Sequence, residues 1–488
     1  MLFRSPAYET FGTAGFFGVV MNYSALIGHG VTPLCPVVVT PSTRVVEEPT
    51  DDQVNRWDRL SRRETFLVKL EETFSALKKN VITSYFVIDL GAVVMGIVLL
   101  GKILIPRRFD RFVERLYHWI VPPVPTKLTI DAPIVPADPH SHAQPLGFTL
   151  DQQIGIVEGQ LRVIGLTTRF ARLTIFVGHG STSQNNPHES AHDCGACGGK
   201  HGGPNARALA AMANKADVRL ALSKRGIDIP SDTYFVGAQH NTASDRMTYL
   251  ETDRIPPSHH EEFSRLVKDL DAARALNAQE RCRLLPLAPK QASPARSLRH
   301  MERRSVNFSQ VHPEWGHATN ASAVIGRRTL TKNLYLDRRT FLQSYDPFQD
   351  PDGAILERIM TAVGPVAAGI ALEYYFSRVD NIRYGSGTKV PHNVSGLVGV
   401  MDGAQSDLRI GLPFQMVWVH EPMRLTVVVE GQPAILSSIV QRHRGLQKLF
   451  DNLWLHLIVL DMHTGQFVRY LPAGEWSAVP VGQLALLT

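Results

Sequence analysis

Residues 173–199 read LTIFVGHGSTSQNNPHESAHDCGACGG and join a short apolar run to a glycine-rich loop. The run at 173–177 predicts a buried strand, and the loop leaves the carboxyl end of that strand. A helix follows from Pro204 to Gly226, and residues 233–236 predict a second strand. This order predicts a parallel βαβ unit, a fold element whose functional side chains gather at the carboxyl ends of the strands.

The same loop concentrates side chains that bind metals. Three histidines, two cysteines, a glutamate and an aspartate lie within residues 178–199. Zinc is bound in proteins by thiolates and imidazoles, and a closed site needs four such ligands. Cys194 and Cys197 form a CxxC pair, which fits a shared metal, a redox pair or two reduced cysteines that are simply buried. The spacing alone does not choose among these three interpretations.

Composition indicates a globular protein of two to four domains. The 488 residues are 44% hydrophobic and 20% charged. The net charge of +6 is the small difference between 51 basic and 45 acidic residues, so we expect no nucleic-acid partner. Four cysteines in a chain of this size are typical of a reduced, cytosolic protein and exclude a disulfide-rich secreted class.

Composition shifts along the chain predict four regions. They are a partial α/β region with a buried helix at 1–120, a proline-rich linker at 121–145, the βαβ region at 146–300, and a C-terminal α/β region at 301–488. In the last region, residues 425–430 and 455–461 predict strands.

The buried helix of the first region is predicted at residues 81–100. This segment is long enough to cross a bilayer, but it contains Asp89 and two glycines. Only residues 90–100 are uninterrupted and apolar, which is too short for a span. We therefore expect a core helix and not a transmembrane one.

The stretch GHGSTSQNNPHESAHDCGACGGKHGGPNARALAAMAN closely resembles the hallmark region of the DabA family, zinc-containing subunits of bacterial inorganic carbon pumps. Further segments resemble family motifs in the family's order: YETFGTAGFFG (8–18), LCPVVVTP (34–41), FVGAQHNT (235–242), PEWGHATN (313–320), FLQSYDP (341–347), YYFSRVDNIRYGSGTKVPHNVSG (374–396), DLRIGLPFQ (407–415) and HEPMRL (420–425). The resemblance therefore covers nearly the whole chain. It implies a metal site and fold similar to those of β-type carbonic anhydrases, with a parallel or mixed sheet flanked by helices and an additional C-terminal α/β region.

Carried over to this sequence, the family's zinc histidine is His179 and its zinc cysteine is Cys194. The resemblance thus implies Cys194, and not Cys197, as the ligand. Supporting roles near the metal are then expected for the loop's other polar residues, because ligating groups need partners that orient them. These are His188, Glu189, His192, Asp193 and Cys197.

The other two zinc ligands of the family lie in a Cys-x-Asp-x-Arg-Ser-Glu type motif that precedes the YETFG segment. No such motif occurs in these 488 residues, and Cys35 does not replace it, since no aspartate follows two residues later. We expect one of three causes: a gene split so that a separate chain carries the ligands, a frameshift or misassigned start, or a degenerate copy. The chain by itself is not expected to hydrate CO₂.

By resemblance, the chain is a zinc-binding subunit of an energy-coupled pump that converts CO₂ to bicarbonate. Zinc lowers the pKa of bound water from 15.7 to about 7, which makes hydroxide available for attack on CO₂. The resemblance implies the membrane subunit DabB as partner, and a peripheral position on the cytoplasmic side of the inner membrane. Two alternatives stay open: a non-catalytic scaffold for the membrane partner, and an unrelated CxxC zinc or redox enzyme.

Overall fold

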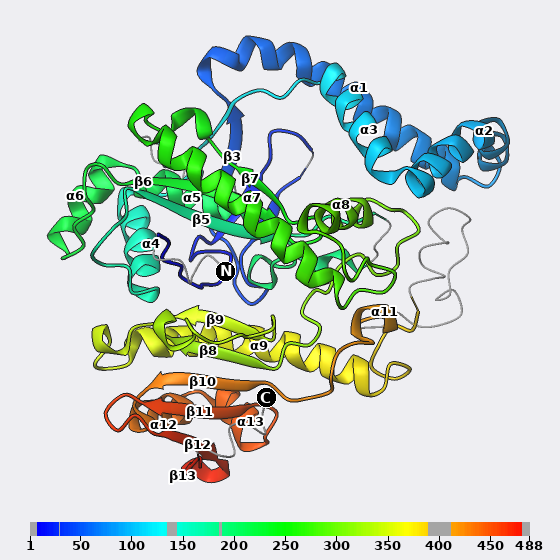
Figure 1. Cartoon of the computed structure of the whole chain (residues 1–488). Helices are drawn as coiled ribbons and strands as arrows, with labels where there is room; N and C mark the ends of the chain where they lie inside the picture. Colours follow the sequence, from blue (N-terminus) through cyan, green and yellow to red (C-terminus); the bar gives the residue numbers. More distant parts are fainter. Residues whose placement is uncertain (1–6, 29, 134–143, 185–187, 389–410, 481–488) are drawn as a thin grey trace.

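The computed structural model describes residues 7–28, 30–133, 144–184, 188–388 and 411–480. Within these ranges the chain is a mixed α/β protein with three sheets (Figure 1). Part of the predicted linker (134–143) and part of the loop quoted above (185–187) lie outside the described residues.

A three-stranded sheet contains the predicted βαβ unit. Strands β5 (Leu173–Gly180) and β6 (Tyr234–Asn241) are parallel neighbours, and β7 (Arg246–Tyr249) adds an antiparallel edge. β5 continues three residues beyond the predicted strand, so that His179 lies on the strand itself. The parallel unit is confirmed, and its carboxyl edge holds the histidine.

Two helices connect β5 to β6 where the sequence predicts one. α5 (Gly203–Ala213) and α6 (Ala216–Lys224) are separated at Asn214. The Asn214 amide donates to the Phe235 carbonyl at 2.8 Å, and its oxygen accepts the Phe235 N–H at 3.0 Å. This pairing fastens the helix break to β6.

α4 (Leu150–Val163) precedes the unit. A capping box defines its start: the Thr149 hydroxyl accepts the Gln152 N–H, and the Gln152 side chain accepts the Thr149 N–H. This arrangement satisfies two backbone donors that a helix start otherwise leaves without a partner.

The N-terminal segment forms a second sheet in the order β2-β1-β3-β4. Its strands are β1 (Met21–Ser24), β2 (Thr32–Leu34), β3 (Arg44–Pro49) and β4 (Thr126–Leu128). β4 comes from the predicted proline-rich linker and pairs antiparallel with β3. The linker therefore contributes a strand as well as a connection.

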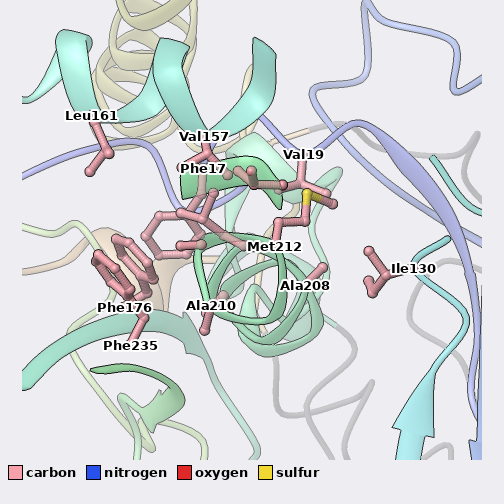
Figure 2. Close-up of a cluster of buried hydrophobic side chains, with 14 of the residues drawn as sticks. Phe17, Val19, Ile130, Val157, Leu161, Phe176, Ala208, Ala210, Met212 and Phe235 are labelled. Atoms are coloured by element: carbon pink, nitrogen blue, oxygen red, sulfur yellow. The ribbon is translucent and has the colours of Figure 1, made fainter. Parts of the chain in front are cut away.

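The two sheets share one hydrophobic core. Figure 2 shows side chains from the N-terminal segment, α4, α5, β5 and β6 packed together. The rings of Phe176 and Phe235 stack at 5.5 Å between centroids, and Phe17 lies 5.9 Å from Phe176. The segment before β1 is thereby held against the end of the βαβ unit.

Three helices are inserted between β3 and β4. They are α1 (Val54–Lys79), α2 (Thr83–Leu104) and α3 (Pro106–Ile120), and they project from the body as an arm (Figure 1). The prediction of a buried helix at 81–100 is wrong: α2 covers this segment and has no buried residue. Composition predicted the helix correctly, but α1 and α3 contact only parts of its surface, and no further layer of the described residues covers the rest.

The C-terminal region forms a six-stranded sheet in the order β13-β12-β11-β10-β8-β9. Its strands are β8 (Ser322–Gly326), β9 (Thr340–Ser344), β10 (Thr426–Gly431), β11 (His456–Asp461), β12 (Phe467–Leu471) and β13 (Glu475–Ala478). The four strands from β8 to β11 are parallel, and β12 and β13 extend the sheet as antiparallel strands. The two strands predicted for this region are confirmed as β10 and β11.

The remaining helices connect these layers. They are α7 (His260–Cys282), α8 (Pro294–Ser305), α9 (Ala354–Val379), α11 (Phe414–Val417), α12 (Pro433–Arg442) and α13 (Arg444–Asp451). Among the described helices, α2 and α9 are long and apolar enough to cross a membrane. In the apolar 18-residue stretch of each helix, 39% is buried in α9 and none is buried in α2. In this respect α9 resembles a core helix and α2 does not.

Candidate metal centre

His179 is fixed by glycines on both sides. An added Cβ at Gly178 would lie 2.3 Å from the Gly202 carbonyl carbon, which leaves no room for any other residue. The Gly202 N–H donates to the His179 carbonyl at 2.9 Å. The end of β5 is thus in direct backbone contact with the residues that open α5.

Cys194 lies in a tight turn closed by backbone hydrogen bonds. Its N–H donates to the Lys200 carbonyl at 3.1 Å, and its carbonyl accepts the N–H groups of Cys197 and Gly199 at 2.9 and 3.0 Å. Gly198 and Gly199 have φ values of 65° and 72°, in the left-handed region that favours glycine. The turn returns the chain to β5 and brings the Cys194 side chain into hydrogen-bond contact with His179.

The contact with Cys197 makes Cys194 the more acidic thiol of the pair. The Cys197 thiol donates to the Cys194 sulfur and lowers the Cys194 pKa to about 5, with His179 adding to the shift against the effect of burial. The same contact and burial raise the pKa of Cys197. Burial alone would lower the pKa of His179, but the hydrogen bond and charge of Cys194 raise it. The lowered pKa favours the thiolate form of Cys194, which is the form that binds metal.

The N-terminal segment forms the third side of the site. An added Cβ at Gly15 would lie 2.7 Å from the Cys194 sulfur and 3.6 Å from the His179 ring. An added Cβ at Gly202 would lie 2.7 Å from the Gly15 carbonyl oxygen. Glycine at these positions lets three distant segments meet at the His179–Cys194 pair. Because glycine has no side chain, residue type alone does not reveal this role in the sequence.

The donor set fits half of a zinc site. Thiolate and imidazole are the ligand types of zinc, and the two are in contact here. Across the part of the chain that the structure describes, no group of three or more His, Cys, Asp or Glu side chains is arranged to hold a metal. His179 and Cys194 can supply two ligands, and a complete shell needs two more.

The other polar residues of the loop contact different groups. The Cys197 thiol lies 3.8 Å from the Asn205 side-chain oxygen. Glu189 accepts the Ser183 N–H at 3.0 Å, and His188 lies 3.3 Å from the Ser386 hydroxyl. These contacts tie the loop to α5, to its own start and to the C-terminal region, which agrees with loop-shaping roles. Ligation by either cysteine stays a prediction.

His192 and Asp193 belong to a buried polar network beside the pair. Asp193 accepts the Ser181 N–H at 2.5 Å, and the Ser181 hydroxyl donates to Glu314. His192 lies 3.3 Å from the same Glu314 oxygen, and His201 lies 3.4 Å from Asp193. The network connects both flanks of Cys194 to residue 314 of the PEWGHATN segment.

Reasoning from residue types did not single out Glu314 or His317. Glu314 is buried and His317 is partly buried, and burial lowers the pKa of His317 to about 4, which favours its neutral form at physiological pH. An added Cβ at Gly316 would lie 2.5 Å from the Tyr374 hydroxyl and 2.7 Å from the His192 ring. In the sequence, only the family resemblance distinguishes the PEWGHATN segment, whereas in the structure this segment packs directly against the loop.

Comparison with known proteins gives this site its context. The chain matches the family of the probable inorganic carbon transporter subunit DabA over residues 4–455. The chain belongs to this family. It is 47% identical over 473 residues to the probable inorganic carbon transporter subunit DabA 2 of Sorangium cellulosum and 48% identical over 475 residues to the DabA subunit of Methylococcus capsulatus. It is 39% identical over 498 residues to the Salinibacter ruber subunit.

The chain spans less than half the length of the first two relatives. Each alignment covers 96% of this chain, but only 45% of the Sorangium protein and 44% of the Methylococcus protein. For the Salinibacter protein the two shares are 99% and 60%. No solved structure matches the chain. The α/β class is thus shown by the structure itself, and similarity to β-type carbonic anhydrases stays a prediction.

Proposed function

We propose that the chain is part of a zinc-binding subunit for uptake of inorganic carbon as bicarbonate formed from CO₂. Its partner in this proposal is a cation-translocating membrane subunit, DabB, and its position is peripheral on the cytoplasmic side of the inner membrane. Membership of a family of probable inorganic carbon transporter subunits supports the carbon role. The contact between the Cys194 thiolate and His179 is the observation that carries the proposal.

Zinc, when bound, supplies a Lewis acid that makes hydroxide available near neutral pH. The residues of this chain hold and orient it: His179 from a rigid strand end, and Cys194 from a turn closed on Lys200. Cys194 is buried and His179 is partly buried, and a site with little exposure to water strengthens the electrostatic interactions inside it. The remaining two ligands come from residues beyond those that the structure describes.

The decisive experiment measures zinc bound per chain by elemental analysis. We expect little retained zinc in the chain alone, and about one zinc per chain after co-expression with a polypeptide carrying the family's Cys-x-Asp-x-Arg motif. Cys194→Ser should abolish this gain, and Cys197→Ser, the matched control, should keep most of it. Together with DabB, the zinc-loaded pair should restore growth in air to a host that lacks carbonic anhydrase. Recovery of neither zinc nor growth would refute the proposal.

A dithiol redox function is the second candidate, and one observation favours it. An acidic Cys194 paired with a protonated Cys197 is also the arrangement of a reactive CxxC motif. A redox function requires both sulfurs equally, whereas the proposed zinc site requires only one of the two cysteines, Cys194. Equal loss of activity in the two serine variants, with no bound zinc in either, would favour the redox function.

A further inference from the structure

The α2 helix exposes more apolar surface than a water-soluble protein ordinarily tolerates. Its apolar window has a mean hydropathy of 2.3, and no part of that window is buried. Leu90 is 89% exposed and Val93 is 73% exposed. Contiguous patches of this kind mark sites that bind a membrane or another protein.

The length of α2 suits a transmembrane span, but its connections exclude one. At 22 residues it is about 33 Å long, against a hydrocarbon thickness of about 30 Å. The arm leaves and re-enters the body at one place, because β3 pairs with β4 and the Thr50 N–H donates to the Pro125 carbonyl at 3.0 Å. Both ends of the arm therefore lie on the same side of any membrane.

An arm of this kind must cross a bilayer an even number of times. α1 carries eleven charged residues in 26 and α3 carries six in 15, so neither can cross hydrocarbon. The arm therefore contains no second helix that could return the chain across the bilayer after α2. Its far end is also attached to the body: the Phe308 N–H donates to the Lys102 carbonyl at 3.3 Å, and Arg107 pairs with Glu302 at 2.6 Å.

The residues around α2 are of the types that bind the surface of an anionic lipid bilayer. Lys78 and Lys79 precede it, and α3, which follows it, contains four arginines against two acidic residues. Along α3, Phe112, Leu116 and Trp119 recur at helical spacing on one side and are exposed, as in helices that lie in the membrane interface. Basic residues beside exposed aromatic and aliphatic ones attract phospholipid headgroups while the apolar side enters the acyl region.

We propose that α2 and α3 enter one leaflet of an anionic phospholipid bilayer without crossing it. The arm is thus a monotopic membrane anchor built into the N-terminal sheet. This inference deepens the proposed peripheral location and is independent of the metal site, since lipid binding needs no zinc. A chain that binds vesicles, yet recovers neither zinc nor growth after co-expression with the motif-bearing polypeptide, would refute the carbon proposal and leave this one standing.

Flotation of the full chain with vesicles tests the proposal. The chain should float with vesicles of phosphatidylcholine containing about 30% phosphatidylglycerol, and less well with pure phosphatidylcholine. The double variant Val93→Asp, Ile97→Asp should reduce flotation about 10-fold or more, because carboxylates are costly in hydrocarbon. Leu220→Asp is the matched control, since Leu220 is exposed on α6 of the body, and it should float like the wild type.

A labelling experiment decides whether α2 crosses the bilayer. Lys79→Cys places a thiol at the exposed end of α1, and the four native cysteines are buried. Membrane-impermeant maleimide added outside intact vesicles should label this thiol. Protection until detergent is added would show a span and overturn the proposal. Failure of the wild-type chain to float with either lipid would also overturn it, and would favour the apolar flank of a membrane protein as the occupant.

Discussion

Replacing Gly15 with alanine tests whether the N-terminal segment sets the geometry of the metal pair. The added Cβ would lie 2.7 Å from the Cys194 sulfur, whereas ordinary contacts begin at 3.4 Å. The sulfur or the segment must therefore move by about 0.7 Å, several times the tolerance of about 0.2 Å in a metal–ligand distance. Gly15 does not have a positive φ, so backbone strain does not contribute.

We expect Gly15→Ala to weaken metal binding by about 10- to 100-fold, the range found when groups that orient a ligand are disturbed. Titration of the chain alone with excess Co²⁺ measures this, because without the motif-bearing polypeptide the thiolate-to-cobalt charge-transfer band reports binding at Cys194, and Cys194→Ser supplies the blank. Gly159→Ala is the control: it lies in α4 with open space around it, and it should bind Co²⁺ like the wild type. A Gly15→Ala affinity within twofold of wild type would refute the reasoning.

Three further predictions concern ionisation and stability. In the metal-free chain, the ultraviolet absorbance of the thiolate should rise with pH, with a midpoint near pH 5. This transition should be absent in Cys194→Ser, and its midpoint should move to higher pH in Cys197→Ala, which removes the hydrogen-bond donor. An unchanged midpoint in Cys197→Ala would contradict the contact between the two thiols. Asp245→Asn should cost about 3–5 kcal/mol in chemical denaturation, because it leaves the buried Arg281 charge without its carboxylate partner 2.8 Å away. Although burial alone would raise the pKa of Asp245, Arg281 lowers it to about 2, below an unfolded value near 4. Its contribution to stability is therefore present above about pH 4 and lost as the pH falls towards 2, and the variant should lose that part of the acid dependence. Thr149→Ala should cost about 1 kcal/mol by removing the α4 cap, and a cost near zero would show that the capping box does not stabilise the fold.

Local patterns predicted the elements around the site well. An apolar run followed by GHG predicted β5 and the position of His179 at its carboxyl end, because strand length and glycine turns are local properties. The break between α5 and α6 was not predicted, since it depends on Asn214 reaching Phe235 on another element. Strand β4 was not predicted, because it lies in a proline-rich stretch and its three residues carry too little pattern to identify a strand.

The α2 helix shows the limit of composition. Its residues predicted a helix, and a helix formed, but whether an apolar helix is covered depends on what packs against it. Among the described residues the arm has no neighbour on most of α2, and β3 pairs with β4 so that both ends of the arm meet the body at one place. Neither fact is present in any window of twenty residues.

The sequence by itself predicted the βαβ unit, the side-chain types of the loop and, through its resemblance, His179 and Cys194 as candidate ligands. Only the tertiary structure decided that these two side chains touch, that Cys197 makes Cys194 acidic, and that Gly15 lies against both. The reason is physical: periodicity and turn chemistry act over a few neighbouring residues, whereas the surroundings of His179 and Cys194 are made by contacts between segments far apart in the chain. Such contacts are fixed by packing of the shared core, which no local pattern records.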